Sequence, residues 1–124
     1  MNRQRPINLD LTSLSFPPMA IASILHRISG ILIFLLLPFL LYLFCLSLQS
    51  ASSFSQLQKL MMNTPVKVGL WMVSSALAYH IIAGIRHITL DMGFGESLQV
   101  AKRSALIVIL LGVVITIFLG VWIW

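Results

Sequence analysis

Hydroxyl and ionisable side chains inside two otherwise apolar stretches are the residues of this sequence whose types and spacing could do chemistry. They are Ser23, His26, Arg27, His80, Arg86, His87 and Asp91. An ionisable residue within a membrane-spanning segment is costly to place there and is by default a candidate for a functional site. Two such groups in one short chain therefore indicate where its function lies.

Ser23 and Arg27 are four residues apart, so on a helix they share one face at a separation of about 6 Å along the axis. A hydroxyl and a guanidinium on one face can bind a polar group such as a carbonyl or a carboxylate. The alternative is that Arg27 reaches the lipid phosphates and Ser23 bonds to its own backbone. His26, next to Arg27, either lines the same cavity or faces a neighbouring helix.

His80 lies roughly 15 Å from the nearer end of its apolar segment, too deep for its ring to reach the membrane surface. Small residues share its helix face, namely Ala76, Ala83 and Gly84. They leave room for a flat, bulky ligand, which makes His80 a candidate axial ligand of a haem iron rather than part of a zinc site. Helix packing also uses small residues, so a neutral histidine bonded to a neighbouring helix is the alternative.

His87 follows His80 by seven residues and lies on the same face, about 10.5 Å nearer the segment end. Together with Arg86 it could meet an anionic group such as a haem propionate, or the pair could face lipid headgroups. For Asp91 we expect a surface ion pair or a loop cap, with a role in a proton relay as the alternative.

Composition places these residues in a membrane. Of 124 residues, 59% are hydrophobic and 9% are charged, whereas soluble domains carry about 25% charged residues. This composition excludes a soluble globular domain and a disordered chain, and the lone Cys45 excludes a disulfide scaffold. The net charge of +5 does not indicate nucleic acid, because the cations are scattered and form no basic stripe.

The segments without acidic or basic residues predict an all-α integral membrane protein with three transmembrane helices, at about 20–48, 65–90 and 104–124. We expect a single domain over 1–124 with a polar tail over 1–19.

Local signals predict the helix ends and contacts. Thr64-Pro65 is expected to start the second helix as N-cap and first residue, and Gly93 and Gly95 are expected to follow its end. Gly112, Thr116 and Gly120 predict close packing of the third helix. Residues 54–61 have helical spacing and are expected along the membrane interface.

The cations predict the orientation. Six of them flank the tail side and the second loop (Arg3, Arg5, Arg27, Arg86, Lys102 and Arg103), against two at the first loop (Lys59 and Lys67). The positive-inside rule then places the N-terminus in the cytoplasm and the C-terminus outside. Both polar groups would lie in the cytoplasmic half of the bilayer. Trp71, Trp122 and Trp124 are expected near the outer boundary.

Two motifs resemble a known family. Arg5-Pro6 with residues 23–30 (SILHRISG), and residues 80–93 (HIIAGIRHITLDMG), resemble the two signatures of the cytochrome b membrane-anchor subunit of succinate dehydrogenase, respiratory complex II. The resemblance spans nearly the whole chain. Leu90 departs from the family, which more often has methionine or an aromatic residue there.

The resemblance implies roles for single residues. His80 matches the axial ligand of haem b, and Ser23 and Arg27 match ubiquinone-site residues. His26 and Arg27 lie towards the haem propionates, and His87 is a further candidate for cofactor binding. Because this chain has one deeply placed histidine, the second axial ligand is expected from a partner chain, with the haem between subunits in a heterodimeric helix bundle.

The implied function is the haem-binding anchor of succinate:ubiquinone oxidoreductase in the respiratory chain and the tricarboxylic acid cycle. Expected partners are a second anchor subunit, an iron–sulfur subunit and a flavoprotein subunit in the bacterial inner membrane. The chain alone is not expected to be active. The alternative is a haem-free structural anchor for a peripheral dehydrogenase. A transporter or channel ranks last, because the outer halves of the helices are almost entirely apolar.

Overall fold

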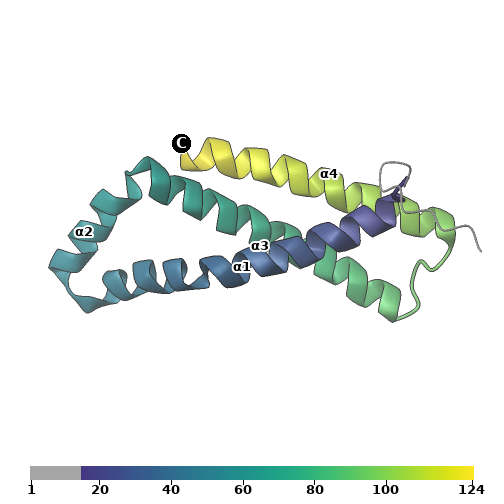
Figure 1. Cartoon of the computed structure of the whole chain (residues 1–124), viewed down its shortest axis with the longest axis horizontal. Helices are drawn as coiled ribbons and strands as arrows, with labels where there is room; N and C mark the ends of the chain where they lie inside the picture. The colour runs from purple at the N-terminus through teal and green to yellow at the C-terminus, as the bar shows by residue number, and fades with distance from the viewer. Residues whose placement is uncertain (1–14) are drawn as a thin grey trace, which may run out of the picture.

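The computed structural model describes residues 15–124, so the expectations for Arg3, Arg5 and most of the tail lie outside the described residues. The described chain forms four helices and no strand. They are α1 (Pro18–Gln49), α2 (Ala51–Met61), α3 (Thr64–Asp91) and α4 (Leu98–Ile123). In Figure 1, α1 and α3 run in opposite directions and cross, α4 runs back along α3, and the short α2 occupies the turn between α1 and α3.

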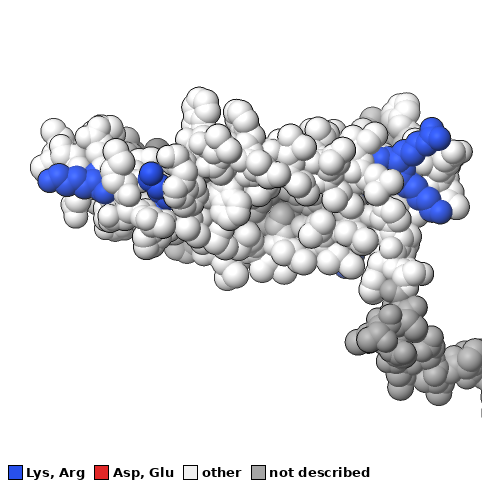
Figure 2. All heavy atoms as spheres, turned by 90° about the horizontal axis from the view of Figure 1, so that it is seen from above, with Lys and Arg blue, Asp and Glu red and all other residues white. Residues whose placement is uncertain are grey.

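The three long helices confirm the expected fold class. Each of α1, α3 and α4 is long and apolar enough to cross a membrane. Large apolar side chains such as Phe34 and Trp122 stand on the outside of the bundle, at 73% and 78% exposure. Figure 2 shows Lys and Arg gathered towards the two ends of the long axis, with an uncharged belt between them on this face. Such a surface suits a hydrocarbon solvent.

Proline and serine residues determine where α1 and α2 begin. Pro17 is extended, at φ −66° and ψ 152°, and Pro18 occupies the first turn, where its missing N–H costs nothing. Helix α1 then runs on through Pro38, which is tolerated within a bundle. An extended Ser50 ends this helix and forms a capping box with Ser53 at the start of α2.

Helix α2 contains residues 54–61, whose apolar side chains have helical spacing, and it packs back onto α1. Its Leu57 is buried with Leu43 and Leu46 of α1, and Leu60 packs against that cluster. Ser53 adds a hydrogen bond of 2.9 Å to the carbonyl oxygen of Leu46. Leu57 and Leu60 of this short helix therefore contact α1, whereas Phe54 and Met61 are exposed.

Two helix starts differ from the sequence predictions. Asn63, not Thr64, is the N-cap of α3, and it makes no side-chain capping bond; Thr64 is already helical. Helix α4 begins at Leu98 rather than near residue 104. The sequence prediction began this helix after Lys102 and Arg103, because charged residues end the apolar span. Both residues are good helix formers, so the helix itself extends beyond the apolar span. Gly93 and Gly95, with φ of 84° and 76°, form the turn after α3.

Aromatic residues of α3 lie over the glycines of α4, which confirms the close packing predicted for this face. A Cβ atom at Gly112 would lie 2.5 Å from Cδ2 of Tyr79, and one at Gly120 would lie 3.3 Å from Nε1 of Trp71. Trp71 Nε1 donates to the carbonyl oxygen of Thr116 at 2.9 Å. The Trp71 indole, which was expected in an aromatic belt, thus joins α3 to α4.

Candidate functional site

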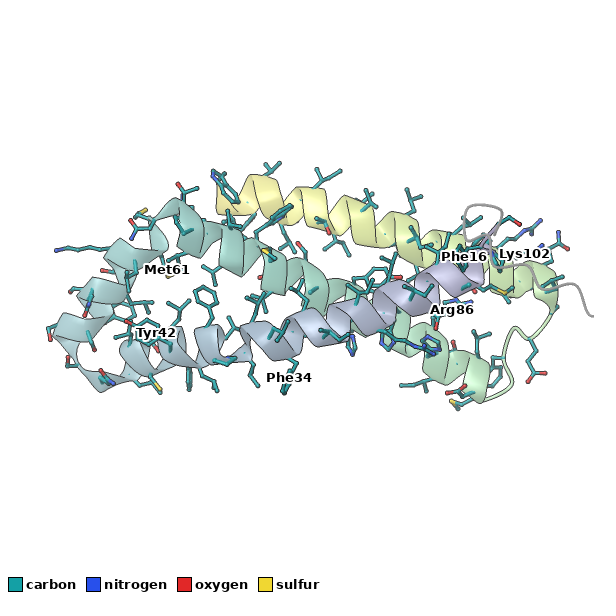
Figure 3. All side chains as sticks on the ribbon, viewed as in Figure 1. Phe16, Phe34, Tyr42, Met61, Arg86 and Lys102 are labelled. Carbon is teal, nitrogen blue, oxygen red and sulfur yellow. The ribbon has the colours of Figure 1, made fainter. Side chains whose placement is uncertain are left out.

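Three histidines from α1 and α3 meet where the two helices cross. The rings of His26 and His80 are stacked, with centroids 4.1 Å apart and an interplanar angle of 19°. The ring of His87 is tilted by 42° to that of His26, with centroids 5.1 Å apart. The antiparallel course of α1 and α3 thus brings the two polar groups of the sequence together. Figure 3 shows Arg86 of α3 towards the same end of the bundle as Phe16 and Lys102.

The His80 ring is fixed at its Nδ1 atom. Nδ1 lies 3.0 Å from Oγ of Ser29 and 3.2 Å from the carbonyl oxygen of His26. Ser29 is buried, at 6% exposure, so its hydroxyl is held against the ring. Within the described residues Nε2 of His80 has no hydrogen-bond partner, and the His80 side chain is only half-buried. The ring therefore presents Nε2 outward from α1.

His26 has the opposite arrangement. Its Nε2 atom is buried and has no hydrogen-bond partner among residues 15–124. This nitrogen lies beside α3, where a Cβ atom at Gly84 would be 3.5 Å away. A buried polar atom without a partner costs about 1–3 kcal/mol, and in this arrangement a ligand from outside the chain cannot reach Nε2 of His26.

The small residues around His80 serve helix packing, which is the alternative that the sequence left open for this face. Ala76 and Ala83 are buried in the bundle, and a Cβ atom at Gly30 of α1 would lie 3.1 Å from Cε1 of His80. Tyr79 adds a bond from its hydroxyl to the carbonyl oxygen of Ala22, at 3.1 Å. The helices thus approach closely beside His80, and any ligand of this ring approaches from the side of Nε2.

Arg86 and His87, which were expected to act as a pair, lie on different sides of α3. The guanidinium of Arg86 is buried and points to α4, where Nε donates to Oγ of Ser104 at 3.0 Å. Its Nη2 donates to the carbonyl oxygen of Ala101 at 3.1 Å. Neither alternative for the pair, an anionic group or the lipid headgroups, therefore fits Arg86: consecutive helix residues point about 100° apart, and Arg86 binds α4.

Ser23 and Arg27 lie on α1 near the histidine cluster. Ser23 is half-buried and Arg27 is exposed, so both can be reached from outside the described part of the chain. Asp91, the last residue of α3, is exposed as well. In residues 15–124 no group of three or more His, Cys, Asp or Glu residues is arranged to hold a metal ion.

Two residues that position His80 were not predicted from the sequence. Ser29 and Gly30 follow His26 in the first motif, but they carry no charge and were not assigned a role. A usable signal was present, because Ser29 is three residues after His26 and therefore on the same side of the helix. Only the crossing of α1 and α3 shows that this side meets His80.

Comparison with known proteins shows the family of this chain. The family described as Succinate dehydrogenase/Fumarate reductase transmembrane subunit matches residues 1–119. A succinate dehydrogenase cytochrome b556 subunit of Coxiella burnetii is 46% identical over 125 residues, covering 100% of both chains. Proteins of the same name from Rickettsia bellii and Rickettsia typhi are 31% and 29% identical, over 95% of this chain and 92% of theirs. This chain therefore belongs to the family of succinate dehydrogenase/fumarate reductase transmembrane subunits.

Proposed function

We propose that this chain is the haem b-binding membrane anchor of a succinate:ubiquinone oxidoreductase, with His80 as an axial ligand of the haem iron. The observation that carries the proposal is the His80 ring, which is bonded at Nδ1 and presents Nε2 without a partner in the described residues. An iron-ligating histidine needs this arrangement, in which one ring nitrogen binds the metal and the other is fixed by a hydrogen bond.

The donor set suits haem better than a bare metal ion. A haem iron is already held by its macrocycle and needs one axial donor from each side, whereas a protein ion site needs several side chains. The described residues form no such ion site. Because this chain has one deeply placed histidine, a partner anchor subunit would supply the second ligand, and the two chains together would hold the haem.

The other two histidines and Arg27 would meet the edge of the haem. The half-buried ring of His87 is suited to its anionic propionates, and His26 would face them with the part of its half-buried ring that remains exposed, since its Nε2 atom is buried. Arg27, which directly follows His26 on α1 and is exposed, adds a positive charge. When bound, the haem supplies a one-electron store in the membrane.

Ser23 and Arg27 would bind ubiquinone, which is the substrate. The Ser23 hydroxyl donates to one quinone carbonyl oxygen, and the Arg27 guanidinium stabilises the negative charge that develops on the quinone as electrons arrive. Protons reach the quinone from the membrane surface, because both residues lie near the start of α1.

The remaining parts of the reaction lie in partner chains. Cys45 is the only cysteine, so this chain cannot ligate an iron–sulfur cluster. An iron–sulfur subunit would deliver electrons to the quinone, and a flavoprotein subunit would oxidise succinate. The cation distribution supports a bacterial inner-membrane location with the N-terminus cytoplasmic and the C-terminus periplasmic.

A haem spectrum of the purified complex tests this proposal. We expect His80→Leu to alter or abolish the reduced b-type spectrum while the complex still assembles, because leucine fills the site but offers no donor. Ser75→Ala, on the same helix, is the matched control and should leave the spectrum unchanged. An unaltered spectrum in His80→Leu would refute the ligand assignment. A wild-type complex that assembles without haem would establish the alternative, a purely structural anchor.

A further inference from the structure

The hydrogen bond between α1 and the His80 ring determines which ring nitrogen carries the proton. Two oxygen atoms lie within hydrogen-bond distance of Nδ1, namely Oγ of Ser29 and the carbonyl oxygen of His26. The carbonyl oxygen can only accept. The Ser29 hydroxyl can do either, so the position of its single proton decides the tautomer of His80.

That proton is already engaged. Ser29 Oγ donates to the carbonyl oxygen of His26 at 2.7 Å, a short bond within one turn of α1. Nδ1 of His80, 3.0 Å away, therefore faces the lone pairs of the Ser29 oxygen. Both oxygens around Nδ1 thus act as acceptors, which requires Nδ1 to be the protonated nitrogen. In a neutral imidazole this leaves the lone pair on Nε2.

Packing holds the ring in this position. A Cβ atom at residue 30 would lie 3.1 Å from Cε1 of His80, so Gly30 lets the ring come close to α1. The His26 ring covers one face of the His80 ring at a centroid distance of 4.1 Å. Ser29 itself is buried at 6% exposure, so water does not readily replace its hydroxyl as the partner of Nδ1.

We propose that Ser29 is a positioning residue for His80: its hydroxyl oxygen accepts a hydrogen bond from Nδ1–H and so keeps the Nε2 lone pair directed towards a haem iron. This inference rests on the proposed function, because it assumes that His80 is the iron ligand. A hydrogen bond from the distal nitrogen makes a histidine ligand more electron-rich, which stabilises oxidised iron relative to reduced iron. Loss of the Ser29 hydroxyl should therefore raise the midpoint potential of the haem.

The experiment is a redox titration of the haem absorption band in the assembled complex, together with the low-spin electron paramagnetic resonance signal of the oxidised haem. We compare Ser29→Ala with Ser29→Thr, which keeps the hydroxyl. Ser75→Ala is the matched control, because Ser75 is also a half-buried membrane serine and its Oγ atom has no partner among residues 15–124.

We expect a more positive potential and a shifted or broadened resonance signal in Ser29→Ala, and wild-type values in Ser29→Thr and Ser75→Ala. An unchanged potential in Ser29→Ala overturns the proposal, and so does the same shift in Ser29→Thr. If Ser29→Ala does not assemble, Ser29→Cys takes its place, because cysteine is nearly isosteric but its sulfur is a weak acceptor. A more positive potential in Ser29→Cys then supports the proposal, and an unchanged potential overturns it. A normal haem spectrum in His80→Leu would instead refute the ligand assignment, so the two failures are distinguishable.

Discussion

His26 holds His80 in two ways. Its ring stacks on the His80 ring at a centroid distance of 4.1 Å, and its backbone carbonyl oxygen lies 3.2 Å from His80 Nδ1. One residue of α1 therefore restricts both the tilt and the in-plane rotation of a ring on α3. This double contact links the first sequence motif to the second, and it makes the geometry at His80 depend on side chains that need not touch a cofactor.

The stack leads to a prediction for haem retention. An aromatic pair is worth about 0.5–1.5 kcal/mol beyond the area it buries, which corresponds to roughly a 2- to 10-fold change in an equilibrium constant. We expect His26→Ala to weaken haem retention by at least this factor, as measured by haem content after detergent washing. His26→Phe keeps a ring for the stack, so its haem retention should stay closer to that of the wild type than to that of His26→Ala. Wild-type retention in His26→Ala would contradict a role for the stack.

Two glycines near the histidines allow a matched comparison of packing. A Cβ atom at residue 30 would press on Cε1 of His80 at 3.1 Å, whereas one at residue 84 would meet Nε2 of His26 at an ordinary 3.5 Å. We expect Gly30→Ala to displace the His80 ring and change the haem spectrum. Gly84→Ala should leave the spectrum near wild type and favour the helix by about 1 kcal/mol. Equal spectra for both variants would show that the close approach at Gly30 is unimportant.

The buried Arg86 predicts a loss of stability without a loss of haem. Removing the hydroxyl in Ser104→Ala leaves the Nε donor of Arg86 without its partner, which costs about 1–3 kcal/mol for a buried group. The complex should therefore unfold at a lower temperature in detergent. Its haem spectrum should be unchanged, because Arg86 points to α4 and away from the histidine cluster. A changed haem spectrum with normal thermal stability would contradict a purely structural role for Arg86.

Ser23 and Arg27 predict a selective defect in quinone chemistry. Removing one donor that stabilises developing charge lowers turnover on the order of 10²-fold in well-studied enzymes. We expect Ser23→Ala and Arg27→Leu to impair ubiquinone reduction by the complex. Succinate oxidation with an artificial soluble acceptor should survive in both, because that reaction bypasses the quinone site.

The control for this prediction is the ratio of the two activities. If both fall together in Ser23→Ala or Arg27→Leu, the defect is one of assembly and the quinone assignment fails. Arg27→Lys is informative as well, since lysine keeps the charge but loses the planar set of donors. Its quinone activity should lie between those of wild type and Arg27→Leu.

The sequence by itself determined the fold class and the identity of the interacting groups. Apolar segments long enough to cross a bilayer must become helices there, because the backbone has no other partner in lipid. Three such segments with short connections then force α1 and α3 to be antiparallel, which was enough to predict that His26 and His80 lie in the same half of the membrane. The packing face of Gly112 and Gly120 was also readable from spacing alone.

Only the tertiary structure decided which side of each helix meets which neighbour. Helical periodicity fixes the angle between residues on one helix, but not the rotation of that helix against the next, which depends on side-chain packing at the crossing. That rotation turned Arg86 towards Ser104 and separated it from His87. It also brought an uncharged serine, Ser29, to the His80 ring. The histidines are visible in the sequence, whereas the contacts that orient them exist only once α1 and α3 are packed.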